Sequence, residues 1–203
     1  MIALIDYGMG NLGSVEKALV KVGCEVRVTA DAGVIREAAG VVLPGVGAFD
    51  DCMINLKAAG VIPAIEAAVA ADKPFLGICL GLQVLFESSE EGKLPGLGLL
   101  PGKVVRFRHD LKVPQIGWNQ IAVRQDCPQL RGIADGSWVY FVHSFYPEPA
   151  DETLTATVTN YGYDFVSAVR RGNLFASQWH PEKSAAVGLH VLENFRHLVE
   201  AAQ

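Results

Sequence analysis

The sequence is short of features that mark several common classes of protein. Its 203 residues carry 17 lysines and arginines against 22 acidic residues, so the net charge is -5 at pH 7. Such a balance offers no basic surface for nucleic acid or for anionic lipid. No apolar run approaches the length of a membrane span, and the opening segment 1–6 (MIALID) lacks a charged leader. We therefore expect a cytoplasmic protein without a nucleic-acid or membrane partner.

Paired cysteines are also missing. The four cysteines, Cys24, Cys52, Cys79 and Cys127, are scattered, and none belongs to a C-x-x-C pair. This distribution argues against a zinc site or a disulfide framework and favours free thiols in a reducing compartment. There is no internal repeat, low-complexity tract or linker. With 50% hydrophobic residues and 21 glycines, residues 1–203 are suited to a single compact α/β domain.

Apolar runs alternate with helical periodicity in the first half of the chain. We expect strands at 1–5, 25–29, 40–43 and 74–78, separated by helices that end at Gly23 and that cover 34–38, 50–71 and 80–90. This order predicts a parallel sheet flanked by helices. Short alternating runs then predict antiparallel strands added to the sheet, at 103–107, 116–123, 138–146, 154–159, 165–170 and 174–178. A last helix is expected at 185–201.

The segment 77–81 (GICLG) lies where the fourth of these strands meets a helix. Glycines two residues before and two after Cys79 remove side chains that would collide in a sharp turn, as in the nucleophile elbow G-x-S-x-G. Such a turn strains the backbone of the nucleophile and exposes its sulfur ahead of a helix N-terminus, which favours the thiolate. Cys79 is therefore the candidate nucleophile. The alternative is a cysteine buried as a small hydrophobe.

A thiolate that performs acyl chemistry needs a base, and a base works best when it is oriented. The sequence offers His109, His143, His180, His190 and His197. We interpret His190 and His197 as solvated or capping residues of the last helix, and His109 as exposed in a charged patch. His180 follows a strand, and in an extended segment Glu182 points to the same side and can orient the imidazole. His180 and Glu182 are thus the predicted base and its partner.

The developing oxyanion of such a reaction needs hydrogen-bond donors. The N–H of Leu80 is one by the geometry of the elbow. A second is expected from the glycine loop 44–47 (PGVG), which leaves the third strand, although an ordinary turn fits this loop equally well. Gln83 lies one helical turn after Cys79, so its amide can read a polar group of the substrate.

A second glycine pattern, G-x-G-x-x-G at 8–13, follows the first strand and precedes a helix, and Asp31 ends the next strand. This is the pattern of a dinucleotide-binding fingerprint. However, Asp6 and Tyr7 separate the strand from the glycines and place a carboxylate near the expected pyrophosphate, and the chain has no room for a separate catalytic domain. We favour a glycine-rich turn that allows close packing.

Two segments, 77–83 (GICLGLQ) and 178–183 (QWHPEK), resemble the class I (triad) glutamine amidotransferases. Within this family the chain is similar to the glutaminase subunits of imidazole glycerol phosphate synthase, in segments 6–11 (DYGMGN), 44–49 (PGVGAF), 117–119 (GWN) and 143–146 (HSFY). The resemblance spans the chain. Relatives that serve anthranilate or GMP synthesis typically carry histidine in place of Leu82 and a Gly-Gly pair in place of Gly45-Val46, which favours the histidine-pathway subunits.

The resemblance implies a flavodoxin-like fold, with residues 1–203 as one amidotransferase domain, and hydrolysis of L-glutamine without a metal or other cofactor. Cys79 would attack the carboxamide and form a thioester as ammonia leaves, while His180 moves protons and Glu182 orients it. Glu91 is suited to the ammonium group of glutamine. The implied oxyanion and substrate contacts are Val46, Gly47, Leu80, Gln83, Glu91, Ser144 and Phe145.

The resemblance also implies a partner, a separate cyclase subunit with a β/α barrel. This partner would receive the ammonia in a heterodimer and make imidazole glycerol phosphate and aminoimidazole carboxamide ribotide for histidine biosynthesis. Contacts with it are implied for Tyr7, Asn11, Trp118 and Lys183. The competing hypotheses are an amidotransferase of another pathway, a cysteine hydrolase of similar fold that acts on peptides or esters, and a flavodoxin-like binding module in which Cys79 only packs.

Val46 is the most informative departure from a plain glycine loop. A β-branched residue resists the positive φ that glycine accepts, so turning its N–H toward the oxyanion is costly. We therefore hypothesise that the oxyanion hole is incomplete in the isolated subunit and is completed when the cyclase binds its ligand. Gln115 and Phe145 also replace the histidine and tyrosine of many relatives, which affects only side-chain hydrogen bonding at those positions.

Overall fold

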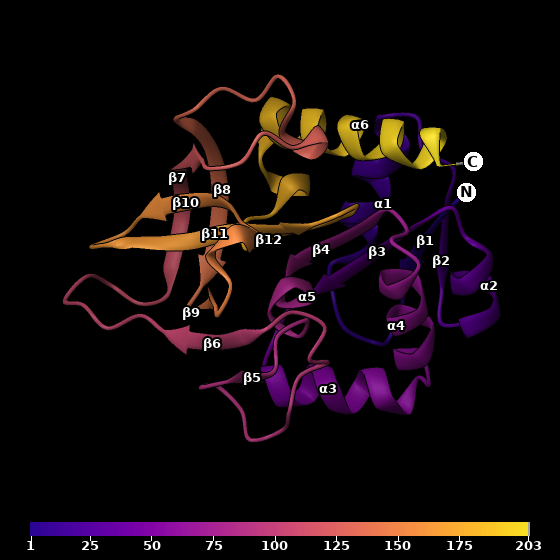
Figure 1. Ribbon diagram of the computed structural model, residues 1–203, viewed down its shortest axis with the longest axis horizontal. Coiled ribbons are helices and arrows are strands. Elements are labelled where there is room, and N and C mark those ends of the chain that lie inside the picture. Colours follow the sequence, from indigo (N-terminus) through magenta and orange to yellow (C-terminus); the bar gives the residue numbers. More distant parts are fainter. Residues whose placement is uncertain (203) are drawn as a thin grey trace.

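The computed structural model describes residues 1–202 and is built around a nine-stranded sheet with the strand order β2-β1-β3-β4-β12-β11-β10-β7-β8 (Figure 1). Neighbouring strands are parallel from β2 to β12. These parallel strands are β1 (Ile2–Ile5), β2 (Val26–Thr29), β3 (Gly40–Gly45), β4 (Phe75–Cys79) and β12 (Leu174–Ser177). All but β2 are buried along their whole length, as expected for strands covered by helices on both faces.

Helices cover both faces of this parallel part, and each face has its own apolar core. Along β1, Ala3 and Ile5 pack with α2 (Ala32–Glu37), α3 (Phe49–Ala58) and α4 (Ile62–Ala70), because successive side chains of a strand point to opposite faces. Ile2 and Leu4 pack with α1 (Leu12–Lys21) and α6 (Ala185–Ala201) on the other face. In Figure 1, α6 and α1 lie above the sheet and α3 and α4 lie below it.

The expected helix 50–71 is interrupted. Gly60 has φ +67°, Pro63 lies in the first turn of α4, and the axes of α3 and α4 differ by 96°. Within residues 1–202 no single helix is long and apolar enough to cross a membrane, and α3 and α4 reach the required length and composition only as this bent pair.

The expected helix 80–90 is far shorter than predicted. The helix α5 (Leu80–Gln83) has four residues, after which the carbonyls of Val84 and Phe86 accept hydrogen bonds from Leu97 and Gly98. The chain then enters β5 (Ser88–Ser89). Pairing with the segment that returns after Gly96 replaces the helical hydrogen bonds that the sequence pattern predicts.

The second half of the chain extends the sheet with antiparallel strands, as predicted, but not in one sheet. β7 (Gln115–Val123), β8 (Ser137–His143), β10 (Thr155–Asn160) and β11 (Asp164–Arg171) continue the main sheet, whereas β6 (Gly102–Arg106) and β9 (Phe145–Pro149) form a second sheet with β5. The predicted strand 138–146 therefore divides at Ser144, between two sheets. Short 3-10 turns lie at η1 (Pro128–Leu130), η2 (Glu152–Leu154) and η3 (Pro181–Lys183).

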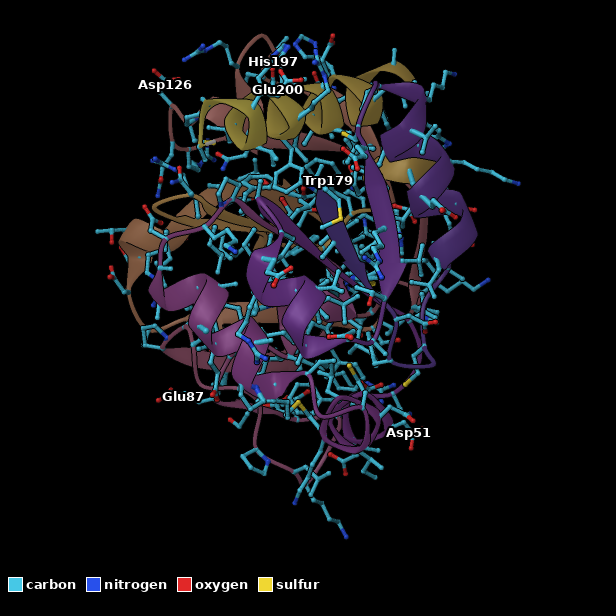
Figure 2. All side chains as sticks on the ribbon, turned by 90° about the vertical axis from the view of Figure 1, so that its right-hand side faces the viewer. Asp51, Glu87, Asp126, Trp179, His197 and Glu200 are labelled. Carbon is cyan, nitrogen blue, oxygen red and sulfur yellow. The ribbon has the colours of Figure 1, made fainter. Side chains whose placement is uncertain are left out.

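The terminal helix α6 packs on one face of the sheet and covers the segment that follows β12. Trp179 lies beneath it with no exposed area, and its ring centroid is 6.3 Å from that of Phe175. Figure 2 shows Trp179 inside the molecule, while His197 and Glu200 lie on the outer side of α6. His190 and His197 are exposed, which agrees with their interpretation as solvated residues.

The turn after β4 is as sharp as the glycine spacing predicts. Cys79 has φ 55° and ψ -108°, a strained conformation for a residue with a side chain. A Cβ atom added at Gly81 would lie 1.9 Å from the carbonyl oxygen of Leu43, and one added at Gly77 would lie 2.8 Å from the Cβ of Ala176. Both glycines are therefore required by close approach of the backbone to neighbouring strands.

Replacing Gly81 by alanine should destabilise the fold strongly. The new methyl group overlaps a backbone carbonyl that cannot move without shifting β3, so we expect a loss of about 3 kcal/mol or more in urea unfolding. Gly13→Ala in α1 is the matched control, because no atom lies within 4 Å of its added Cβ. That control should leave stability unchanged or raise it by up to about 1 kcal/mol. Equal stability of the two variants would refute the steric argument.

Candidate active site

The strand register places the candidate catalytic residues at one edge of the sheet. Gly45 pairs with Cys79, and Ser177 pairs with Ile78, so β3, β4 and β12 end side by side. The loop 44–47, the elbow and the segment that leads to His180 therefore meet at the carboxyl ends of the parallel strands. This edge is where open α/β sheets place their sites.

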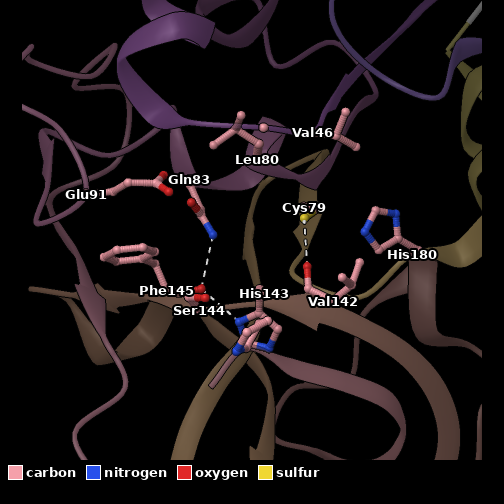
Figure 3. A pocket seen from close by; sticks show the side chains of 12 residues that line it. Val46, Cys79, Leu80, Gln83, Glu91, Val142, His143, Ser144, Phe145 and His180 are labelled. Carbon is pink, nitrogen blue, oxygen red and sulfur yellow. Dashed lines mark hydrogen bonds between the residues drawn. The ribbon is translucent and has the colours of Figure 1, made fainter. Parts of the chain in front are cut away.

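A cavity of about 270 Å³ opens at this edge (Figure 3). It brings together nine of the residues that the sequence singles out, including Cys79 and His180. Its lining consists of Val46, Gly47, Cys79, Leu80, Gln83, Glu91, Pro114, Val142, His143, Ser144, Phe145 and His180. Pro114, Val142 and His143 were not predicted, because nothing in their local sequence indicates that β8 and the turn before β7 close the cavity.

His180 and Glu182 form a buried pair beside Cys79. Nδ1 of His180 lies 2.8 Å from Oε1 of Glu182, and both side chains are almost fully buried. The segment is not extended as predicted, because Pro181 to Lys183 form the turn η3, and this turn nevertheless brings the two side chains together. Nε2 of His180 is buried and has no hydrogen-bond partner in the described part of the chain.

The charge state of His180 follows from these neighbours. Burial alone would lower the pKa of His180, but interactions with the Cys79 sulfur and the Glu182 carboxylate outweigh burial and raise the pKa to about 9. At neutral pH the imidazole is therefore protonated. An imidazolium next to a cysteine sulfur favours the thiolate, which is the reactive form.

Gln83 presents an oxygen to the cavity. Its Nε2 donates to the carbonyl of Phe145 at 3.1 Å and to Oε1 of Gln178 at 3.0 Å. The amide nitrogen is thus occupied, and the Gln83 oxygen lies on the side of Glu91 in Figure 3. The sequence indicated a polar contact from Gln83, and the structure limits that contact to an acceptor.

Glu91 is anchored to the start of α3. Its Oε2 accepts a hydrogen bond of 3.0 Å from the N–H of Phe49. Burial raises the pKa of Glu91, and the nearby Asp50 and Asp51 raise it further, whereas the bond from Phe49 lowers it. The carboxylate is held rigidly at the wall of the cavity, with one oxygen bound by the backbone.

The buried side chain of Tyr7 holds the loop 44–47 in place. The Tyr7 hydroxyl donates to the carbonyl of Pro44 at 2.8 Å and accepts from the thiol of Cys52 at 3.3 Å. Tyr7 is only 4% exposed in the isolated chain, so its side chain supports the loop 44–47 from the interior. Burial also raises the pKa of Tyr7 well above its usual range, so the hydroxyl stays neutral.

The glycine pattern 8–13 serves packing. A Cβ added at Gly10 would lie 3.5 Å from Cγ of Pro44, and one added at Gly47 would lie 2.9 Å from Cε of Met9. The loop after β1 therefore packs on the loop after β3, which agrees with the glycine-rich turn that we favoured. Among residues 1–202 only Asp72, Cys79 and Ala185 combine a side chain with a positive φ, so Val46 keeps an ordinary φ here.

The outer hairpin β7–β8 carries a surface rich in aromatic side chains. Ile116, Trp118 and Trp138 are 59%, 49% and 53% exposed, and Trp118 is paired with Tyr140 across the hairpin. Lys183 lies with its Nζ 5.9 Å from the centre of the Tyr140 ring. Trp118 is therefore no core residue. Asn11 is exposed as well, and although it precedes α1, its side chain makes no capping hydrogen bond.

Two other histidines are shielded from solvent, His143 almost completely and His109 in part. His143 contacts the Phe145 carbonyl through Nδ1 at 2.8 Å and Gln115 through Nε2 at 2.9 Å, and burial lowers its pKa to about 3. It is therefore neutral. His109 is half-buried rather than exposed as predicted, because Phe107, Tyr161 and Tyr163 pack around its ring.

The sequence model of the class-I glutamine amidotransferases matches residues 3–198, so the chain belongs to this family. It is 52% identical to the imidazole glycerol phosphate synthase subunit HisH of Syntrophotalea carbinolica, over 96% of this chain and 98% of that protein. It is also 52% identical to the subunit of the same name from Moorella thermoacetica, over 99% and 96%.

Solved structures of similar fold support the architecture. A glutamine amidotransferase aligns over 100% of this chain and 99% of its own, with a TM-score of 0.74 at 19% identity. The glutaminase domain of Trypanosoma brucei CTPS with bound acivicin aligns over 99% and 92%, with a TM-score of 0.69 at 15% identity. The predicted α/β class, a mostly parallel sheet with added antiparallel strands, is confirmed.

The raised pKa of His180 should make the folded state lose stability at alkaline pH. Because the pKa of about 9 exceeds the ordinary 6.5, the stabilisation is fully present below pH 6.5 and is lost as the pH rises through 9. One proton allows a slope of at most about 1.4 kcal/mol per pH unit in urea unfolding. Glu182→Gln removes a carboxylate that stabilises the protonated imidazole. The free energy of unfolding of this variant should therefore fall less steeply as the pH rises. Superimposable profiles of the two proteins would contradict the assignment.

Proposed function

We propose that this protein is the glutaminase subunit of an imidazole glycerol phosphate synthase and hydrolyses L-glutamine to glutamate and ammonia. The observation that carries the proposal is the buried His180–Glu182 pair, 2.8 Å apart, beside Cys79 on a strained turn. The full-length identity of 52% to subunits of that name favours this pathway over those of other amidotransferases.

The chemistry begins with a proton on His180. Nε2 of His180 holds the proton that comes from the Cys79 thiol, and the thiolate attacks the carboxamide carbon of glutamine. The N–H of Leu80 and the loop 44–47 stabilise the oxyanion that develops. His180 then gives its proton to the departing nitrogen, ammonia leaves, and a thioester remains. His180 next takes a proton from water, and the resulting hydroxide attacks the thioester carbon. The carbon–sulfur bond breaks, glutamate leaves, and the Cys79 thiolate beside the protonated His180 is restored.

The part of the cavity away from Cys79 binds the α-ammonium and α-carboxylate groups of glutamine. The free oxygen of Gln83 and the carboxylate of Glu91 form a pair of acceptors that suits the ammonium group. The Phe145 carbonyl already contacts Gln83 and His143, and the Ser144 carbonyl accepts from Phe107. Main-chain and hydroxyl donors of Ser144 and Phe145 are therefore the groups that remain for the substrate carboxylate.

A cyclase subunit with a β/α barrel receives the ammonia, as the partner in a one-to-one heterodimer. The surface of Ile116, Trp118, Trp138, Tyr140 and Lys183 supports this proposal, because exposed aromatic side chains beside a cation are typical of protein interfaces. Asn11, whose side chain makes no cap to α1, is a further contact. The complex makes imidazole glycerol phosphate and aminoimidazole carboxamide ribotide in histidine biosynthesis.

Replacing Cys79 by alanine should separate ammonia production from ammonia use. In the complex with the cyclase, glutamine-dependent synthesis should fall by roughly 10³-fold or more, because no thioester forms. Synthesis from added ammonium salt should continue at the wild-type rate, measured by product absorbance. Loss of both activities in a folded complex would argue against delivery of ammonia to a separate subunit.

The ordinary φ of Val46 predicts that the isolated chain is a slow glutaminase. Turnover should rise when the ligand-loaded cyclase is added, and Val46→Gly should raise the rate of the isolated chain by about tenfold, because glycine adopts positive φ without strain. Val46→Ala is the matched control and should bring no such gain. Equal turnover of the wild-type chain alone and with the loaded cyclase would exclude this activation.

A further inference from the structure

Gln178 is a buried polar residue next to the nucleophile that the mechanism above does not use. It follows β12, has no exposed area, and does not belong to the lining of the cavity. Its Nε2 lies 3.5 Å from Sγ of Cys79, and its Oε1 accepts from Nε2 of Gln83 at 3.0 Å. The side chain is thus inserted between the nucleophile and a residue of the substrate cavity.

The orientation of the Gln178 amide follows from its neighbours. The carbonyl of Phe145 can only accept, so Gln83 must direct its NH2 group toward that oxygen, 3.1 Å away. The same NH2 group faces Gln178, which must therefore present its oxygen to Gln83. The Gln178 NH2 group is then left facing the sulfur of Cys79. A hydrogen bond donated to sulfur favours the negatively charged thiolate over the thiol.

We propose that Gln178 is a further catalytic residue, which donates an N–H hydrogen bond to the Cys79 sulfur and stabilises the attacking thiolate. The proton of the thiol is held on Nε2 of His180, and no bond to Gln178 is made or broken. The proposal rests on the proposed function, since it concerns the same nucleophile. The chain of contacts from Phe145 through Gln83 and Gln178 also fixes the sulfur relative to the substrate cavity.

Gln178 carries no charge at any pH, and neither does the carbonyl of Val142, which lies 4.0 Å from Sγ of Cys79 and can only accept. His180 and Glu182 face the site from the segment after β12, His143 from β8 and Tyr7 from the end of β1. Burial keeps both His143 and Tyr7 neutral between about pH 5 and pH 9, since it lowers the pKa of the first and raises that of the second. Gln178 should therefore shift the titration of the thiol without adding a titration of its own.

Alkylation of Cys79 by iodoacetamide, followed by peptide mass spectrometry over a range of pH, tests the proposal without glutamine. A failure here is thus distinct from a failure of the glutaminase assignment. Gln178→Met keeps the length of the side chain but removes the donor, so the midpoint of the alkylation profile should rise by about one pH unit. The value of kcat for glutamine at pH 7 should fall by about tenfold.

Gln129→Met is the matched control, because Gln129 is equally buried but directs its Nε2 to the carbonyl of Asn173. In this variant, the midpoint of Cys79 alkylation should equal that of the wild type. A folded Gln178→Met protein with the wild-type midpoint would overturn the proposal.

The wild-type protein provides a second test that holds even when Gln178→Met does not fold. In ¹⁵N NMR spectra, the side-chain amide signal of Gln178 should shift across the alkylation midpoint, because its acceptor changes from thiol to thiolate. The signal of Gln129 should stay constant. A Gln178 signal that does not move with the titration of Cys79 would equally overturn the proposal.

Discussion

The contact between Gly81 and the carbonyl of Leu43 is the constraint on which the site depends. The start of α5 lies against the end of β3, and the chain leaves β4 through a turn in which Cys79 takes a positive φ. The strain of that turn is held by two flanking strands that are buried on both faces. The same turn directs the sulfur into the cavity and keeps the next N–H free for an oxyanion.

The remaining parts of the site come from segments that the sheet brings to the same edge. β12 runs parallel to β4 in the middle of the sheet, and the residues after it supply Gln178, His180 and Glu182. The break at Ser144 turns the chain from the main sheet into the small one and closes the cavity on the opposite side. The first half of the chain thus carries the nucleophile, and the second half carries the groups that control its proton.

Sequence reasoning predicted the parallel half of the fold and the nucleophile, because buried strands and paired glycines leave strong local signals. It could not predict features set by distant contacts. The end of α5 depends on a segment that returns after Gly96, and the burial of Tyr7 depends on the carbonyl of Pro44, 37 residues away. Gln178 was noted only as part of a motif, because its contacts with Gln83 and Cys79 span nearly a hundred residues. The partial burial of His109 could not be predicted, because its neighbours in the sequence are charged whereas its neighbours in space are aromatic.

The central claim is that Cys79 is a glutamine-directed nucleophile and not a packing residue. The most direct test is to incubate the protein with a diazo-ketone analogue of glutamine and to locate the adduct by peptide mass spectrometry. We expect a single adduct on Cys79 that excess L-glutamine prevents, because the analogue must occupy the cavity beside Gln83 and Glu91 to react. An unmodified Cys79, or labelling that glutamine does not diminish, would contradict it.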